Sequence, residues 1–195
     1  MIVILLGNNP AALGQETQDQ SSSVPTPPPL SIQAPFKEQE FASYEKKKKG
    51  TASISGQAFM VTKGKDVKYQ PGGTVALVPE TSYTKEWVEK YVQEQGSCSF
   101  NGFDNALLKD QKECRLPQRI FRIILGDKRL SPYVRFTQAN PTGNSWFNKV
   151  PPGKYFLVTS ITWEITLDGP IAGGLAWADV EVEPGEQVAN VMVTH

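Results

Sequence analysis

Short apolar runs separated by turns rich in proline and glycine are the feature that most constrains how this chain folds. The clearest example is Val150-Pro151-Pro152-Gly153, which has one apolar run before it and another after it. Proline fixes φ, and glycine reaches backbone conformations that other residues avoid, so the motif forms a tight turn. We therefore predict a β-hairpin here. Proline and glycine turns between short strands are typical of small β-sandwiches.

Seven segments after Thr51 have the alternation or the apolar content of β-strands. They are residues 54–61, 74–78, 133–139, 145–149, 155–165 and 176–182, and a last strand in which Ala189, Val191 and Val193 face one way. Residues 140–144 contain Pro141 and Gly143 and predict a second hairpin. The pattern predicts an all-β fold, a seven-stranded antiparallel sandwich with one short helix.

Three regions of different composition predict the domain organisation. Residues 1–14 begin with an apolar run followed by small residues, which resembles a truncated signal segment and favours export to the periplasm, cell surface or extracellular space. Residues 15–50 are rich in Pro, Ser and Gln and predict a disordered spacer. Residues 51–195 hold the sandwich. No segment approaches the roughly 18 apolar residues of a membrane span, so we expect no transmembrane span in the mature chain.

The spacer ends in four consecutive lysines, residues 46–49. Glu38, Glu40 and Glu45 lie just upstream and dilute the local field, which favours a solvated charge run. The alternative is contact with anionic lipid, peptidoglycan or an acidic partner. The formal net charge of the whole chain is zero, so we expect no nucleic-acid partner.

An insertion over residues 81–130 interrupts the strand pattern. Its apolar stripe consists of Trp87, Val88, Tyr91 and Val92. This spacing predicts one amphipathic helix, with Thr84 as a candidate N-cap and Gly96 as a candidate stop.

The two cysteines of the chain, Cys98 and Cys114, both fall within this insertion. In an exported protein they predict one disulfide that closes the insertion and stabilises the fold by about 3 kcal/mol. The single histidine, His195, is the last residue, so we expect no zinc site, no other metal and no cofactor.

Four motifs together resemble bacterial carboxypeptidase regulatory-like domains. They are residues 55–59 (SGQAF), 73–79 (GTVALVP), 150–155 (VPPGKY) and 180–186 (VEVEPGE), which occur in the order of that family. The likeness covers residues 51–194 and implies a seven-stranded transthyretin-like, or prealbumin-like, sandwich. It also implies an accessory, adhesive or scaffold role. The insertion with the two cysteines departs from the compact pattern of the family.

No arrangement of residues typical of catalysis stands out, so we predict no catalytic residue and no enzyme. Transthyretin-like hydrolases use several His and Arg residues, and sandwich dioxygenases bind iron through paired His and Tyr ligands, which one histidine cannot supply. The carboxylates Asp179, Glu181 and Glu183 recur with period two, which places them on a solvent face of a strand.

Aromatic residues supply the binding candidates. They are Tyr83, Trp87, Tyr91 and Trp177. The three in the helix form an exposed platform for sugar or peptide, or pack the helix onto a sheet, and helical spacing favours packing. Trp177 shares its predicted face with Asp179, which favours partial exposure, whereas Trp146 and Trp163 are expected in the core or at an edge between sheets.

Together these features predict a non-enzymatic interaction or scaffold module with a protein partner in the bacterial envelope or in an extracellular assembly. Carbohydrate binding through exposed aromatic residues is the alternative.

Overall fold

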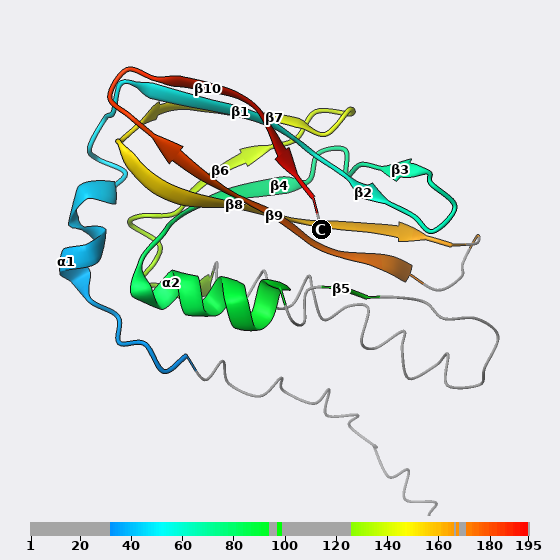
Figure 1. The fold of residues 1–195 in the computed structure, drawn as a ribbon, viewed down its shortest axis with the longest axis horizontal. Coiled ribbons are helices and arrows are strands. Elements are labelled where there is room, and N and C mark those ends of the chain that lie inside the picture. Colours follow the sequence, from blue (N-terminus) through cyan, green and yellow to red (C-terminus); the bar gives the residue numbers. More distant parts are fainter. Residues whose placement is uncertain (1–31, 94–96, 99–125, 166, 168–170, 195) are drawn as a thin grey trace, which may run out of the picture. The chain divides into compact units, whose positions relative to one another are not determined.

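Two stacked β-sheets form the body of the fold (Figure 1). The computed structural model describes residues 32–93, 97–98, 126–165, 167 and 171–194. The fold lies within Ile32–His195, which separates as a unit from Met1–Ser31. No helix among the described residues is long and apolar enough to cross a membrane.

The first sheet has three strands in the order β10-β1-β7. They are β1 (Ala52–Ala58), β7 (Asn144–Val150) and β10 (Gln187–Val193). β1 is antiparallel to β7 but parallel to β10, so the prediction of a wholly antiparallel arrangement is wrong for this pair. Every second residue of β1 is buried, which gives the sheet an inner face against the core and an outer face toward solvent.

A bulge interrupts β10 where its register against β1 shifts. Asn190 adopts a φ of 62° there. The extra residue reverses the alternation, so Ala189 is exposed, Val191 is partly buried and Val193 is buried. The prediction that these three residues face one way is therefore wrong for Ala189.

The second sheet has five strands in the order β5-β9-β8-β4-β6. They are β4 (Thr74–Pro79), β5 (Ser97–Cys98), β6 (Arg135–Gln138), β8 (Gly153–Glu164) and β9 (Ile171–Val182), and a separate hairpin joins β2 (Met60–Val61) to β3 (Val67–Lys68). The described residues thus form ten strands. The predicted all-β class is confirmed, but the count of seven strands is not.

The hydrophobic core fills the space between the inner faces of the two sheets. Its large members include Ile54, Leu77, Phe147, Val150, Tyr155, Leu157 and Ile161. The alternation predicted for β9 is confirmed, because Ala176, Val180 and Val182 are buried whereas Asp179 and Glu181 are exposed.

The Val150-Pro151-Pro152-Gly153 turn joins the two sheets and does not connect paired strands. β7 ends at Val150 in the three-stranded sheet, and β8 begins at Gly153 in the five-stranded sheet. β8 has β9 on one edge and β4 on the other, so no edge is left for β7. The prediction of a hairpin is wrong. The turn carries the chain across the core, and Gly153 supplies the required φ of 142°.

Residues 140–144 make the opposite crossing, from β6 in the five-stranded sheet to β7 in the three-stranded sheet. The side-chain oxygen of Asn140 accepts the backbone N–H groups of Thr142 at 3.0 Å and Asn144 at 2.9 Å. Sequence correctly predicts the turn, but the predicted hairpin between these strands is wrong.

Helix α2 (Ser82–Trp87) continues as the π-helical segment η2 (Val88–Gln93) against the outer face of the five-stranded sheet (Figure 1). Trp87, Val88 and Val92 are buried, as the predicted apolar stripe requires. The side chain of Tyr91 and the candidate stop Gly96 lie outside the described residues.

Thr81, and not the predicted Thr84, is the N-cap of α2. The Thr81 hydroxyl accepts the backbone N–H of Thr84 at 3.3 Å, and the Thr84 hydroxyl accepts the backbone N–H of Thr81 at 2.9 Å. This reciprocal pair is a capping box, in which threonine takes the place that glutamate or glutamine usually has.

Residues 32–50 pack onto the sandwich, although sequence predicts them as part of a disordered spacer. They form helix α1 (Glu38–Phe41) and the short 3-10 turn η1 (Ala42–Tyr44). Phe41 is 0% exposed, and the centroid of its ring lies 4.6 Å from that of Phe36 and 4.9 Å from that of Tyr133. The folded part of the chain therefore begins before the boundary predicted at Thr51.

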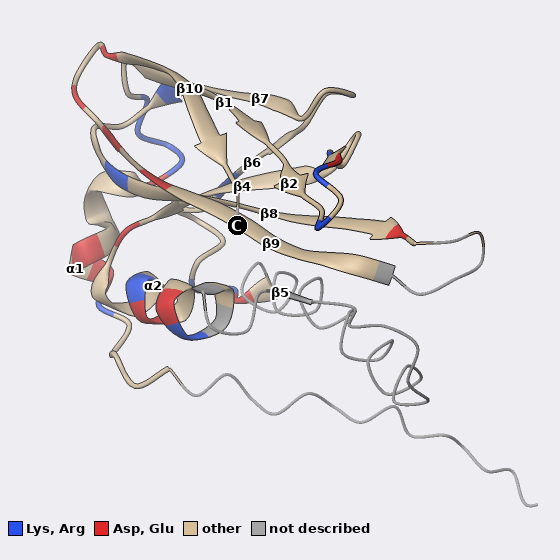
Figure 2. Cartoon of the chain, turned by 45° about the vertical axis from the view of Figure 1, so that its right-hand side comes forward, with Lys and Arg blue, Asp and Glu red and all other residues tan. Residues whose placement is uncertain are grey.

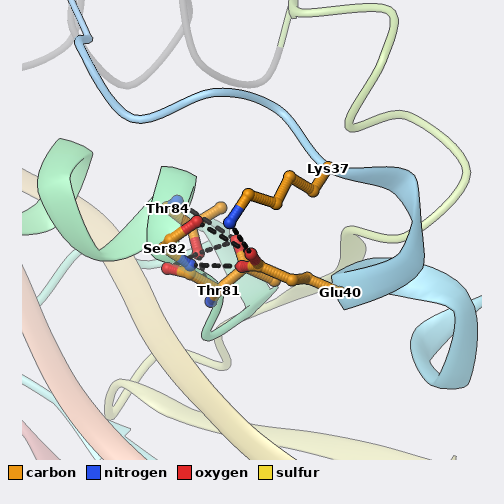
Figure 3. A network of polar contacts seen from close by, with 5 residues as sticks. All are labelled: Lys37, Glu40, Thr81, Ser82 and Thr84. Atoms are coloured by element: carbon orange, nitrogen blue, oxygen red, sulfur yellow. Dashed lines mark hydrogen bonds and ion pairs between the residues drawn. The ribbon is translucent and has the colours of Figure 1, made fainter.

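Two carboxylates fasten this N-terminal segment to α2. Glu40 accepts the backbone N–H of Ser82 at 2.7 Å and its hydroxyl at 3.0 Å, and it pairs with Lys37 at 3.3 Å (Figure 3). Glu86 accepts the backbone N–H groups of Gln33, at 2.8 Å, and of the residue after it. These hydrogen bonds favour the charged carboxylates and lower the pKa of both Glu40 and Glu86.

Cys98 lies in β5, where it pairs with Gly173 of β9. Cys114 and most of the insertion lie outside the described residues. The disulfide between the two cysteines stays a prediction.

Candidate functional site

The aromatic residues of α2 are buried. Trp87 is 0% exposed, and Tyr83 is 8% exposed. The Tyr83 hydroxyl donates to Asp127 at 3.1 Å and accepts from Arg129 at 2.8 Å, and the Arg129 guanidinium stacks 5.1 Å from the ring centroid. Burial raises the pKa of this hydroxyl. Buried rings present no face to a ligand, so the packing interpretation describes Tyr83 and Trp87.

Trp177 is partly exposed in β9, as predicted, and lines a cleft of about 310 Å³ beside α2. The cleft is lined by Glu80, Lys85, Val88, Glu89, Lys154, Phe156, Trp177 and Asp179. Most of these side chains are charged, and both signs are present. A ligand that enters the cleft must desolvate these charges, which costs free energy unless the ligand pairs with them.

A far more exposed tryptophan lies on the outer face of the three-stranded sheet. Trp146 of β7 is 53% exposed and lies opposite Ser55 of β1. Phe147 is buried in the core, so alternation places Asn144 and Asn148 on the same outer face as Trp146.

Uncharged side chains surround Trp146, and all of them except Met192 are polar. We term this surface the neutral face, and it consists of Ser53, Ser55, Gln57, Asn144, Trp146, Asn148 and Met192. Gln57 donates to the carbonyl of Thr142 at 2.7 Å, and Asn144 donates to its hydroxyl at 2.7 Å, which fixes both amides. Ser55 and Asn148 form no side-chain hydrogen bond with any described residue, so their polar groups are open to a ligand.

The three strands of this sheet are almost free of charge. β1 and β10 contain no charged residue, and β7 contains only Lys149 near its end, although 21% of the whole chain is charged. Figure 2 shows β1 and β10 without charge colours. Depletion of charge around exposed Trp and Met side chains is typical of the centre of a binding surface.

Sequence reasoning missed Trp146 because it favoured the core or an edge between sheets. The available signal was alternation, since Trp146 shares its parity with Asn144 and Asn148. Trp163, for which the same position was expected, is partly buried and packs against the core.

Metal ligands do not gather in the described part of the chain: no three His, Cys, Asp or Glu side chains there are placed to hold an ion. His195 lies outside that part.

Comparisons with known proteins bear on the fold. No protein-family model and no curated protein matches the sequence. Among solved structures, the fold is similar to a crystal structure from Pseudomonas aeruginosa described as a "putative carbohydrate binding protein", with a TM-score of 0.59 and 21% sequence identity. The match covers 83% of this chain and 99% of that chain. At this identity the likeness shows the fold alone, and the resemblance to carboxypeptidase regulatory-like domains stays a prediction.

Proposed function

We propose that this protein is a non-enzymatic carbohydrate-binding module whose glycan binds on the neutral face. The observation that carries the proposal is Trp146, which is 53% exposed on a sheet face with amide and hydroxyl side chains and no charged ones. The similar fold of a protein described as carbohydrate binding supports the same class of ligand.

The chemistry of a sugar suits this surface. The C–H face of a sugar ring is apolar and packs flat against an indole, which contributes a large contact area at a low cost in side-chain entropy. The hydroxyl groups around the ring can pair with the polar groups of Ser55 and Asn148. Binding there desolvates no charge, in contrast to the cleft beside Trp177. Since the side chains project from paired strands, little backbone ordering is needed on binding.

The test is a glycan array followed by calorimetry with the best soluble glycan. We expect Trp146→Ala to weaken binding by about 30-fold or more, equivalent to about 2 kcal/mol for a central aromatic contact. Trp177→Ala is the matched control, because it removes an indole from the cleft and leaves the neutral face intact. Loss of binding in the Trp177 variant alone would place the glycan in the cleft. Failure of the wild-type chain to bind any glycan would contradict the proposal.

A protein partner in the envelope or in an extracellular assembly is the second candidate. Met192, 69% exposed on the neutral face, favours it, because exposed apolar side chains with few charges around them are also typical of protein interfaces. A partner that co-purifies with the wild-type chain from its host and is lost with Met192→Ser would support this role. Export also stays a prediction, since residues 1–14 lie outside the described part of the chain.

A further inference from the structure

Six cationic residues lie close together beside the end of β7. They are Lys46, Lys47, Lys48, Lys49, Arg135 and Lys149, which we term the basic turn. The lysine run follows η1, and the backbone N–H of Lys46 donates to the carbonyl of Pro132 at 2.9 Å. The run was predicted to end a disordered spacer, but it is a turn held against the sandwich. Figure 2 shows its blue segment beside the sheets.

Arg135 of β6 joins the lysine run to β7. Its guanidinium donates to the carbonyl of Lys149 at 2.8 Å and to the carbonyl of Lys48 at 3.0 Å. The backbone N–H of Gly50 donates to the same Lys149 carbonyl at 3.1 Å. Because Arg135 binds neutral carbonyls and no carboxylate, its positive charge adds to the field of the lysines.

The positive charge of the basic turn is largely uncompensated. None of the six cations forms an ion pair with a carboxylate in the described residues. Of the upstream carboxylates expected to dilute this field, Glu40 is paired with Lys37 at 3.3 Å, while Glu45 remains in the turn. Partial burial, and then the nearby charge of Arg135, lower the pKa of Lys46.

The basic turn is continuous with the neutral face along β7. Lys149 directly follows Asn148 of the neutral face. Trp146 is three residues before Lys149, which corresponds to at most about 10 Å along β7 at the rise of a β-strand. An extended polymer that packs on Trp146 and runs along β7 therefore reaches the cations of the turn.

We propose that the glycan is an anionic polysaccharide, whose rings pack on Trp146 and whose acid groups bind the basic turn. This inference rests on the proposed function and adds the class of ligand. Charge complementarity argues for it, because uncompensated cations at the edge of a binding face attract an anionic chain and repel cationic ones. The neutral face alone would not distinguish an acidic glycan from a neutral one.

The experiment compares polygalacturonate with its methyl-esterified form, which has the same backbone without the negative charges. The test variant of the full chain carries Lys47→Gln, Lys49→Gln and Lys149→Gln. The side chains of these three lysines form no hydrogen bond or ion pair with described residues, so the fold should persist. The control carries Lys63→Gln, Lys65→Gln and Lys68→Gln around the β2–β3 hairpin, at the other end of the sandwich (Figure 1).

We expect the wild-type chain and the control to bind polygalacturonate at least about tenfold more tightly than the ester, and the test variant to lose this preference. The preference should also shrink as salt screens the charges. Equal binding of the two polymers by the wild-type chain, or an unchanged preference in the test variant, would overturn the inference.

Two further measurements separate this inference from the proposed function. In the first, Trp146→Ala should weaken binding of both polymers. In the second, the wild-type chain is tested with polyglutamate, which has no sugar ring, and binding as tight as that of polygalacturonate would overturn the inference. If the wild-type chain binds neutral glycans through Trp146 without preference for acid groups, the proposed function stands and only the anionic class fails. If it binds no glycan at all, both fail.

Discussion

Replacement of Phe41 by alanine tests whether residues 32–50 belong to the fold. Phe→Ala substitutions in protein cores cost about 3–5 kcal/mol. Phe41 is 0% exposed, and its ring contacts those of Phe36 and Tyr133, where aromatic pairs add about 0.5–1.5 kcal/mol to the effect of burial. We therefore expect a loss of about 4 kcal/mol in the free energy of unfolding, a large share of the roughly 5–15 kcal/mol that holds a typical domain together.

The assay is equilibrium unfolding of the full chain in urea, followed by tryptophan fluorescence. With a slope of about 2 kcal/mol per molar urea, the midpoint should fall by about 2 M. Phe136→Ala is the matched control, since Phe136 is 46% exposed and should cost less than about 1.5 kcal/mol.

A loss below about 1 kcal/mol for Phe41→Ala, with an unchanged urea slope, would contradict a stabilising role for the buried Phe41 ring. It would mean that the segment contributes little to global stability, as a spacer would. A large loss in both variants would instead show that any aromatic truncation weakens this domain, whether the ring is buried or exposed.

The remaining predictions concern pH and backbone strain. Hydrogen bonds lower the pKa of Glu40 and Glu86, so their stabilising contribution is present above the ordinary value of 4.5 and is lost as pH falls through the lowered values. In unfolding experiments at different pH, the double variant Glu40→Gln, Glu86→Gln should therefore lose less stability in acid than the wild-type chain. The same dependence of the free energy of unfolding on pH in both proteins would contradict this prediction. Gly153→Ala should lower the thermal midpoint, since φ is 142° there and a Cβ would lie 2.7 Å from the Tyr44 ring. Gly72→Ala should cost less, because its φ of 68° lies in the left-handed helical region and nothing lies within 4 Å of the added Cβ. Equal costs for the two variants would contradict this prediction.

Local patterns predicted local structure well. The period-two alternation of β9 and the helical stripe over α2 and η2 each depend on residues a few positions apart, and the described apolar members of both are on the expected side of their element. The proline and glycine turns were found for the same reason. The path of the chain after each turn was not predicted, because a tight turn after a strand leads equally well to a paired strand or to the opposite sheet. The choice depends on which sheet edges other strands already occupy.

The N-terminal segment shows how composition can mislead. Residues 15–50 are rich in Pro, Ser and Gln as a whole, and this average hides three aromatic residues near its end. Phe36 and Phe41 are five residues apart, which fits neither a helix nor a strand, and the single i,i+3 pair of Phe41 and Tyr44 is too short a pattern to predict an element. Their anchoring depends on partners such as Tyr133 and Tyr155, which lie about a hundred residues away in the sequence.

The neutral face could not be found as a motif, because it is defined by missing charges in three separate strands. An uncharged stretch of seven residues such as β1 is unremarkable in any sequence, and the same holds for β10. Only the pairing of both strands and β7 in one sheet turns the three stretches into a surface, with Trp146 on its outer side. For the basic turn the opposite holds. Its lysines are obvious in the sequence, but only the hydrogen bonds of Arg135 place them beside Lys149, next to the surface along β7. A binding surface made in this way is a property of the topology, and it follows that variants should be chosen by sheet position and not by sequence motif.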